Sequence, residues 1–438
     1  MRKTRKIPAL ASAIIVLVAL SGCSSNGGSS TTSAAVPGTI DKHLSGSTIT
    51  ILMPPWSQMK ASDYQAFTDL TGIKIKLDIE QFDQVHDKVV TAMAANVPPA
   101  DVIEVDSLWI GQFGAAKWLA PLENLIAPSA LSTVGAKEIF QYDHVQIAMP
   151  YALDFRWIAV NMTMLEKAGI TAAPATWPDL LAAAKALKAK GISKYPIGIP
   201  TSVTAETVEP WLNLTKMAGG ELLDASGKPA FNDPNSAGFK SLQFLQSAYA
   251  AGLVNPGYAN VQGEKVQEDF AAGLVAFDMR NGPSVAYNDP VKAKVAKDNI
   301  QRIVIGETAI ANTVYGLPEG MGIPANSKNI EAAAMFISWF NLAPQEVALY
   351  GVSFPGVLPA QPAALEELIK AGTLPDGDKI KSILPGVVPL FPLGAPTWWP
   401  QFANDAAATI QAVLVGQKSV KTELDKLAEK TVALTAKG

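Results

Sequence analysis

The chain has little of several residue types on which known classes of protein depend. It has one cysteine, Cys23, in 438 residues, so no disulfide can form within it. Its three histidines, His43, His86 and His144, form no metal-binding pattern, because the first lies near a polar N-terminal stretch and the second on the polar face of an expected helix. The net charge of -4 gives no excess of basic residues, and we therefore expect no nucleic-acid partner.

The sequence also lacks the common catalytic signatures. It has no Gly-x-Ser-x-Gly turn, no His-Glu-x-x-His helix and no phosphate-binding loop that ends in Gly-Lys-Ser/Thr. A pair of carboxylates could serve a glycosidase, but no spacing singles out one pair. We therefore expect a binding protein rather than an enzyme, with no catalytic residues, no cofactor and no metal.

The N-terminus predicts secretion and a lipid anchor. One apolar run lies between Ala9 and Leu20, shortly after four basic residues, and it is too short to span a bilayer comfortably, as is typical of a signal peptide. The residues Leu20-Ser21-Gly22-Cys23 then match the bacterial lipobox, in which the cysteine is acylated. We expect acyl chains on Cys23 to hold the protein at the outer face of the cell membrane. The alternative is a simple cleavage site with a free thiol.

The next segments predict an α/β fold. The stretch Ser24 to Ala35 contains only Ser, Thr, Gly, Asn and Ala, which is typical of a flexible tether. Apolar residues then alternate over 47–53 and 73–79 and follow helical spacing from Tyr64 to Gly72 and from Val85 to Met93, before a third short strand at 101–105. Strand, helix, strand, helix and strand in this order favour a mostly parallel sheet, with ligands beyond the carboxyl ends of its strands.

Three ordered segments carry a resemblance to a known family. They are Pro150-Tyr151-Ala152-Leu153-Asp154, then Phe270 to Phe277 with Asn281-Gly282-Pro283, then Gly320 to Pro324. Together they resemble the extracellular solute-binding proteins of ATP-driven transporters, in the branch of maltose-binding protein. The resemblance implies the two-lobed periplasmic-binding-protein fold (type II-like), with mostly parallel sheets flanked by helices and a ligand cleft between the lobes.

About 390 residues follow the tether, which is too many for one ordinary core and indicates two domains. With the resemblance, this length gives a predicted division of the chain. We expect the signal peptide and lipobox at 1–23, the tether at 24–44, the N-lobe at 45–152 and 313–354, and the C-lobe at 153–312 and 355–438.

The candidate ligand-binding residues come from two sources. The resemblance implies an acidic contact at Asp154, an acidic-proline-aromatic contact at Glu209 and Trp211, a loop contact near Asn281 and a cleft aromatic at one of two adjacent tryptophans. Trp56, Asp106 and Trp109 are candidates because they follow the first and third expected strands. The full set is Trp56, Asp106, Trp109, Asp154, Arg156, Glu209, Trp211, Arg280, Asn281, Trp398 and Trp399.

Each candidate has a structural alternative. The tryptophans could be core residues, Asp106 could cap the following helix, and Arg156 and Arg280 could bridge carboxylates. Where maltose-binding protein has a stacking tryptophan after the glycine-proline pair, this chain has Ser284, which argues against a maltodextrin ligand.

The resemblance implies a lipid-anchored, monomeric receptor that binds a sugar or oligosaccharide and delivers it to the membrane permease subunits of an importer. An amino acid, a polyamine or a metal complex is an alternative ligand. A surface-anchored glycan hydrolase that uses cleft carboxylates is the alternative from another class, and a sensor role involves the same closure of the cleft.

Overall fold

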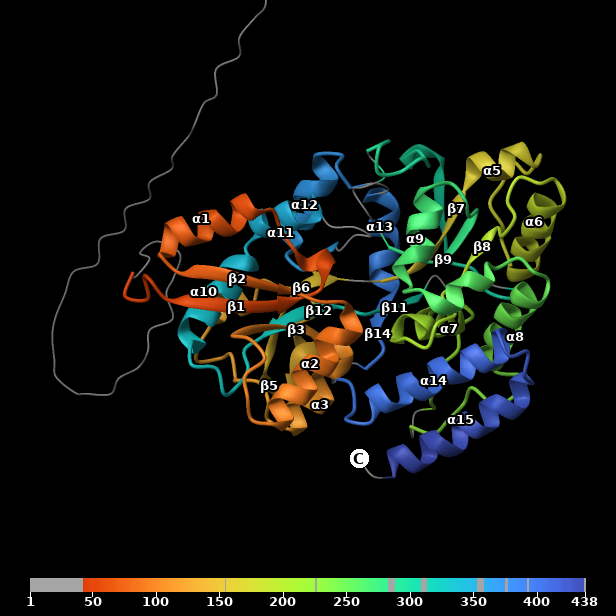
Figure 1. Cartoon of the computed structure of the whole chain (residues 1–438). Coiled ribbons are helices and arrows are strands. Elements are labelled where there is room, and N and C mark those ends of the chain that lie inside the picture. Colours follow the sequence, from red (N-terminus) through yellow and green to blue (C-terminus); the bar gives the residue numbers. More distant parts are fainter. Residues whose placement is uncertain are drawn as a thin grey trace, which may run out of the picture. The chain divides into compact units, whose positions relative to one another are not determined.

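The computed structural model describes residues 42–153, 155–224, 227–282, 287, 289–308, 313–352, 358–374, 377–391 and 394–436 (Figure 1). A six-stranded sheet and a four-stranded sheet organise two separate regions of this part of the chain. No helix in the described part is long and apolar enough to cross a membrane.

The six-stranded sheet is mixed. Its order is β13-β6-β12-β3-β1-β2, with β1 parallel to β2 and β3, whereas β12 runs antiparallel to β3 and β6. The expected strand-helix order is present, but the sheet is not mostly parallel, because β12 and β13 join it from late in the chain and run against their neighbours. Its strands are β1 (Thr48–Met53), β2 (Lys74–Ile79), β3 (Val102–Asp106), β6 (Ala148–Leu153), β12 (Glu319–Gly322) and β13 (Leu358–Pro359).

Helices cover both faces of this sheet (Figure 1). Alternate residues of β1 point to opposite faces, so Ile51 packs with α1 and α10, while Leu52 packs with α2 and α3. Gly72 ends α1 in the left-handed region with φ 78°, as the sequence predicted for a glycine at this place. The helices are α1 (Ala61–Thr71), α2 (Phe82–Ala94), α3 (Ile110–Ala115), α4 (Pro128–Leu131), α10 (Ile330–Phe340) and α11 (Ala343–Tyr350).

The chain passes from the first sheet to the second within a few residues. Only residues 154–156 separate β6 from β7 (Trp157–Asn161), the second strand in the order β10-β7-β9-β8. β7 is antiparallel to both of its neighbours, and only β8 and β9 are parallel. The other strands are β8 (Ile197–Gly198), β9 (Phe277–Asn281) and β10 (Ile300–Ile303).

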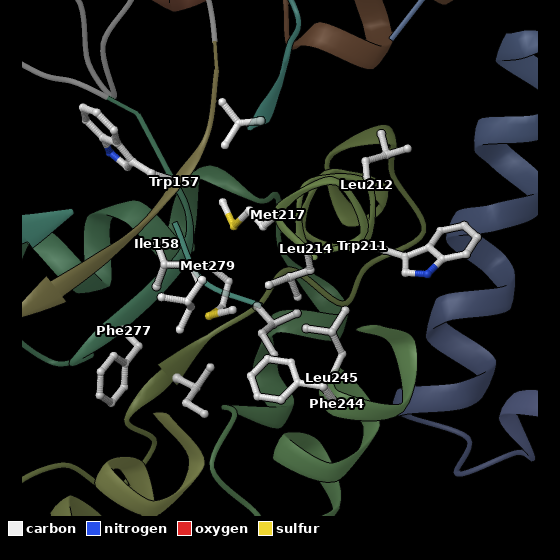
Figure 2. Close-up of a cluster of buried hydrophobic side chains, with 14 of the residues drawn as sticks. Trp157, Ile158, Trp211, Leu212, Leu214, Met217, Phe244, Leu245, Phe277 and Met279 are labelled. Atoms are coloured by element: carbon white, nitrogen blue, oxygen red, sulfur yellow. The ribbon is translucent and has the colours of Figure 1, made fainter. Parts of the chain in front are cut away.

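The core of the second region joins this sheet to its helices. Figure 2 shows Trp157 and Ile158 of β7 with Phe277 and Met279 of β9, in one cluster with apolar residues of α7. The helices of this region are α5 (Met162–Lys167), α6 (Trp177–Ala189), α7 (Val208–Met217), α8 (Ala237–Ala250), α9 (Glu264–Ala271), α14 (Trp399–Leu414) and α15 (Val420–Thr435).

Shorter elements complete the described part. β11 (Val314–Gly316) pairs in parallel with β14 (Val387–Pro389), and β4 (Gln141–Tyr142) pairs with β5 (Val145–Gln146). The helices α12 (Pro362–Lys370) and α13 (Gly377–Ile383) lie between β13 and β14 in the sequence. The division at 354/355 remains a proposal, and β13 lies just past it although it pairs with β6 of the first sheet.

Candidate functional site

A cavity of about 310 Å³ lies between residues of the two sheet regions. Its walls come mainly from the loops and helix starts that follow strands, as expected for an α/β fold. The lining residues are Trp56, Phe82, Asp83, His86, Asp87, Asp106, Leu108, Trp109, Arg156, Val203, Thr204, Ala205, Glu206, Val208, Glu209, Leu212, Glu264, Arg280, Leu317, Glu319, Trp399, Pro400, Ala403 and Asn404.

Aromatic rings form one wall of the cavity. Trp56 lies in a 3-10 turn directly after β1, and Phe82 begins α2 after β2. Their ring centroids are 5.8 Å apart, and the ring of Phe82 is 4.9 Å from that of Trp109, which follows β3. His86, one turn further along α2, is 5.1 Å from Trp109. Three adjacent strand ends therefore supply a continuous aromatic surface.

Hydrogen bonds to buried acids orient the wall at Trp56. Its Nε1 donates to Glu319 Oε2 at 2.8 Å, and the Tyr151 hydroxyl donates to the same oxygen at 2.8 Å. Tyr151 also lies 3.0 Å from Glu104 Oε2. Burial, together with the nearby charge of Glu319, raises the pKa of Glu104 well above its usual range.

Two arginines and two glutamates face this wall from the second region. Arg156 Nε lies 3.1 Å from Glu209 Oε2, and Arg280 contacts both oxygens of Glu209 at 2.8 and 2.9 Å. Arg280 Nη2 also lies 3.1 Å from Glu206 Oε1. Both arginines line the cavity, as the ligand-binding prediction expected. Arg280 also bridges two carboxylates and Arg156 pairs with one of them, which is the structural alternative.

The pKa values of the two glutamates are shifted in opposite directions. Burial tends to raise the pKa of Glu209, but Arg280 and Arg156 outweigh burial and hold that pKa below its ordinary value. Burial raises the pKa of Glu206 to about 7, against the opposing charge of Arg280. In the described part of the chain, Nη1 of Arg280 has no hydrogen-bond acceptor, although only 5% of this residue is exposed.

Trp211 lies in the core and does not line the cavity. Its Nε1 donates to the backbone oxygen of Gly238 at 2.7 Å, and its ring meets Phe231 edge-on. An α-helix turns about 100° per residue, so Trp211 lies about 200° around α7 from Glu209 and faces the opposite side. Glu209 therefore lines the cavity while Trp211 lies in the core, although both belong to one acidic-proline-aromatic segment.

The adjacent tryptophans also separate. Trp399, the first residue of α14, lines the cavity, whereas Trp398 is half-buried and packs edge-on against Phe391 and Phe402. Asp106 lines the cavity and also accepts a hydrogen bond from the Leu108 amide at 2.6 Å, so it has the capping role as well.

Four residues that the sequence analysis named are not described at their side chains. Cys23 and Asp154 lie outside the described residues, and so does Ser284. Asn281 ends β9, but the structure describes only its backbone.

Sequence reasoning missed several lining residues. Phe82 and Asp83 follow the end of β2, so the strand-end rule that selected Trp56 and Trp109 would also have selected them. Glu206 precedes Glu209 by one helical turn and could have been found by that spacing. Glu264 and Glu319 carry no such local signal, because only the folded chain brings them to the cavity.

The acids present at the cavity do not form a metal site. Among the described residues, no group of three or more His, Cys, Asp or Glu side chains could hold a metal ion. What the cavity offers is an aromatic wall, several carboxylates and two guanidinium groups.

Comparisons with known proteins agree with this architecture. A binding protein of Brucella abortus (strain 2308) is 26% identical over 275 residues, which cover 60% of this chain and 63% of that protein. The chain thus spans less than two thirds of that relative's length.

Two solved structures share the fold. A solute-binding protein of an ABC transporter from Thermotoga lettingae, bound to α-D-tagatose, superposes with a TM-score of 0.77 at 22% identity over 89% of this chain and 99% of its own. One from Agrobacterium radiobacter, in complex with ribitol, gives a TM-score of 0.76 at 20% identity over 89% of this chain and 99% of its own.

These likenesses establish the two-lobed architecture of periplasmic binding proteins. The sequence model of one protein family, the bacterial extracellular solute-binding proteins, matches residues 53–347, which are more than half of the chain. The chain therefore belongs to the family of bacterial extracellular solute-binding proteins.

Proposed function

We propose that this protein is the extracytoplasmic receptor of an ATP-driven importer and that it captures a small sugar or polyol. The aromatic wall at Trp56, Phe82 and Trp109, opposite the charged cluster at Glu209, is the observation that carries this proposal. Aromatic faces pack against the C–H surface of a sugar, while carboxylates and guanidinium groups satisfy hydroxyls that leave water.

The size of the cavity favours a small ligand. A volume of about 310 Å³ is near the lower end of the roughly 300–1,000 Å³ typical of ligand pockets. The ligands named for the two structural neighbours, tagatose and ribitol, are a monosaccharide and a sugar alcohol. We therefore favour a ligand of this size over the longer oligosaccharide that the resemblance also allowed.

Residues of both lobes line the cavity, so a bound ligand contacts both. Such a ligand stabilises any conformation in which the lobes close on it, since only that state makes the full set of contacts. The closed form is then the one that permease subunits would recognise.

Isothermal titration calorimetry against monosaccharides, sugar alcohols, amino sugars and disaccharides tests the ligand class. We expect at least one carbohydrate of this panel to bind with 1:1 stoichiometry. The substitution Trp56→Ala should lower the affinity for that carbohydrate by at least roughly tenfold. If no carbohydrate binds while an amino acid, a polyamine or a metal complex does, the ligand proposal fails.

The anchor at Cys23 has its own test. We propose that Cys23 is acylated after removal of residues 1–22, because it directly follows a signal-peptide-like run within a lipobox. The native chain should fractionate with membranes, and Cys23→Ser should release it into the soluble fraction. Retention of the Cys23→Ser chain on membranes would contradict acylation at this residue.

A glycan hydrolase remains the second candidate because Glu206 and Glu209 have pKa values shifted in opposite directions, as a catalytic acid and base require. Both glutamates, however, are bound to Arg280, which by itself explains a structural pair. Incubation with oligosaccharides should yield no new reducing ends. Product that disappears in Glu209→Gln would support the hydrolase instead.

A further inference from the structure

The cavity has an excess of carboxylates. Seven carboxylates and two guanidinium groups line it, and no lysine does so in the described part of the chain. The residues between 42 and 436 that the structure does not describe include no lysine, arginine or histidine. The carboxylates are Asp83, Asp87, Asp106, Glu206, Glu209, Glu264 and Glu319.

The two arginines do not pair with most of these carboxylates. Arg156 pairs with Glu209, and Arg280 pairs with both Glu206 and Glu209, so the two arginines contact none of the other five carboxylates in the ion pairs that the structure describes. Glu319 already accepts two hydrogen bonds. Asp106 accepts one from a backbone amide.

Three acids remain, and two of them face the cavity from different lobes. Asp83 lies in the first turn of α2, beside the six-stranded sheet, and Glu264 begins α9, beside the four-stranded sheet. No hydrogen bond or ion pair to Asp83 is present in the described part of the chain. There, Glu264 Oε2 is also buried without a hydrogen-bond donor. The third acid, Asp87, lies 3.5 Å from His86 Nδ1 and is mostly exposed.

Asp83 and Glu264 are near enough to affect each other. Burial is the largest cause that raises the pKa of Asp83. The charges of Asp87 and Glu264 raise this pKa further, while His86 and Arg280 lower it. The two acids therefore repel one another across the cavity unless a cation lies between them.

Helix-end preference does not account for this arrangement. An acid in the first turn is stabilised by the helix dipole, which suffices to explain Asp83 on α2 or Glu264 on α9 taken singly. It gives no reason for the ends of two helices from separate lobes to present unpaired acids to one cavity. A cationic solute gives that reason.

We propose that the solute is an amino-substituted sugar or polyol whose protonated amine binds between Asp83 and Glu264. Its hydroxyls meet Arg280 and Glu209, which line the cavity, and its C–H face packs on Trp56. The faces of Phe82 and Trp109, beside Asp83, add a favourable surface for a cation. This inference rests on the proposed capture of a sugar or polyol.

Matched ligand pairs test the proposal by calorimetry at pH 7. The pairs are D-glucose with D-glucosamine, D-galactose with D-galactosamine, and D-glucitol with 1-amino-1-deoxy-D-glucitol, each with the neutral N-acetyl derivative of its amine. We expect the amine of at least one pair to bind about tenfold or more tightly than its hydroxyl counterpart, and the acetylated form to lose this gain.

The outcomes separate this inference from the proposed function. If a neutral member binds as tightly as its amine, the amine proposal is overturned while sugar capture stands. If no member of any pair binds, the amine proposal is also overturned, and the wider carbohydrate panel then decides the proposed function independently.

Charge-removing variants locate the amine. The double variant Asp83→Asn with Glu264→Gln should reduce the amine-to-hydroxyl affinity ratio by about tenfold or more. Glu268→Gln is the matched control, because Glu268 is exposed on the same helix α9, pairs with Lys265 and does not line the cavity. An unchanged ratio in the double variant would show that the amine is recognised elsewhere and would overturn the proposal. Circular dichroism checks that the variants are folded.

Discussion

The indole Nε1 of Trp56 donates a 2.8 Å hydrogen bond to Oε2 of Glu319, although 263 residues separate them in the chain. β1 and β12 both flank β3 in the six-stranded sheet, so the strand order brings the end of β1 close to Glu319. The bond fixes the rotation of an aromatic ring that lines the cavity.

Glu319 should therefore be a positioning residue. Removal of its carboxyl group in Glu319→Ala leaves the indole N–H of Trp56 unpaired, and we expect ligand affinity to fall by roughly tenfold. Glu319→Gln retains an acceptor and should restore most of the affinity, as measured by calorimetry. Equal losses in both variants would indicate that the charge matters, not the orientation of Trp56.

Trp56 itself should contribute stacking area that a smaller ring supplies only in part. Trp56→Phe should weaken binding less than Trp56→Ala, because a phenyl ring keeps a face for the ligand but not the bond to Glu319. Trp118→Phe is a control, since Trp118 is half-buried, packs near Phe113 and does not line the cavity. Loss of affinity in the control equal to that in Trp56→Phe would contradict a local role.

Trp211 should affect stability rather than binding. It is fully buried and hydrogen-bonded to Gly238, so Trp211→Ala should lower the free energy of unfolding by about 3–5 kcal/mol. The milder Trp211→Phe should lower the melting temperature but change the dissociation constant by less than about twofold. A large loss of affinity in a fully folded Trp211→Phe protein would place this ring in the binding site after all.

Glu206 should make stability depend on pH near neutrality. Its folded-state pKa of about 7 lies above the ordinary value of 4.5, so the folded protein retains a proton that the unfolded chain has lost. The resulting stabilisation is fully present below about 4.5 and is lost as the pH rises to about 7. In Glu206→Gln this contribution is absent.

Denaturant titrations between pH 4.5 and 8 measure the effect. The free energy of unfolding of the native chain, minus that of Glu206→Gln, should fall across this interval. The pKa of Glu209 is lowered, so this residue loses its proton at more acidic pH. Its contribution to the pH dependence of stability therefore lies below this pH interval. Parallel pH profiles for the two proteins would show that Glu206 does not titrate in this window.

Local patterns predicted the early part of the fold well. Strict alternation predicted β2 at 74–79, and helical spacing that ends at a glycine predicted α1, because side-chain period and backbone conformation are linked within one element. The strand-end rule likewise led to Trp56, Asp106 and Trp109, since each follows its strand in the sequence. The antiparallel entry of β12 and β13 was not predictable in this way, as no local period records which neighbour a late strand will pair with.

Residues that one sequence motif groups together lie apart in the structure. Glu209 and Trp211 form one motif, but helix rotation sends one to the cavity and the other to the core. Of the two adjacent tryptophans at the start of α14, Trp399 lines the cavity and Trp398 does not.

The sequence by itself determined the α/β class and most strand-end residues, because these follow from short-range periodicity and chain direction. Only the tertiary structure decided the charge of the cavity. Glu319 beneath Trp56 and Glu264 opposite Asp83 come from segments far away in the chain. Electrostatic interactions depend on distance in space, and sequence separation does not set that distance.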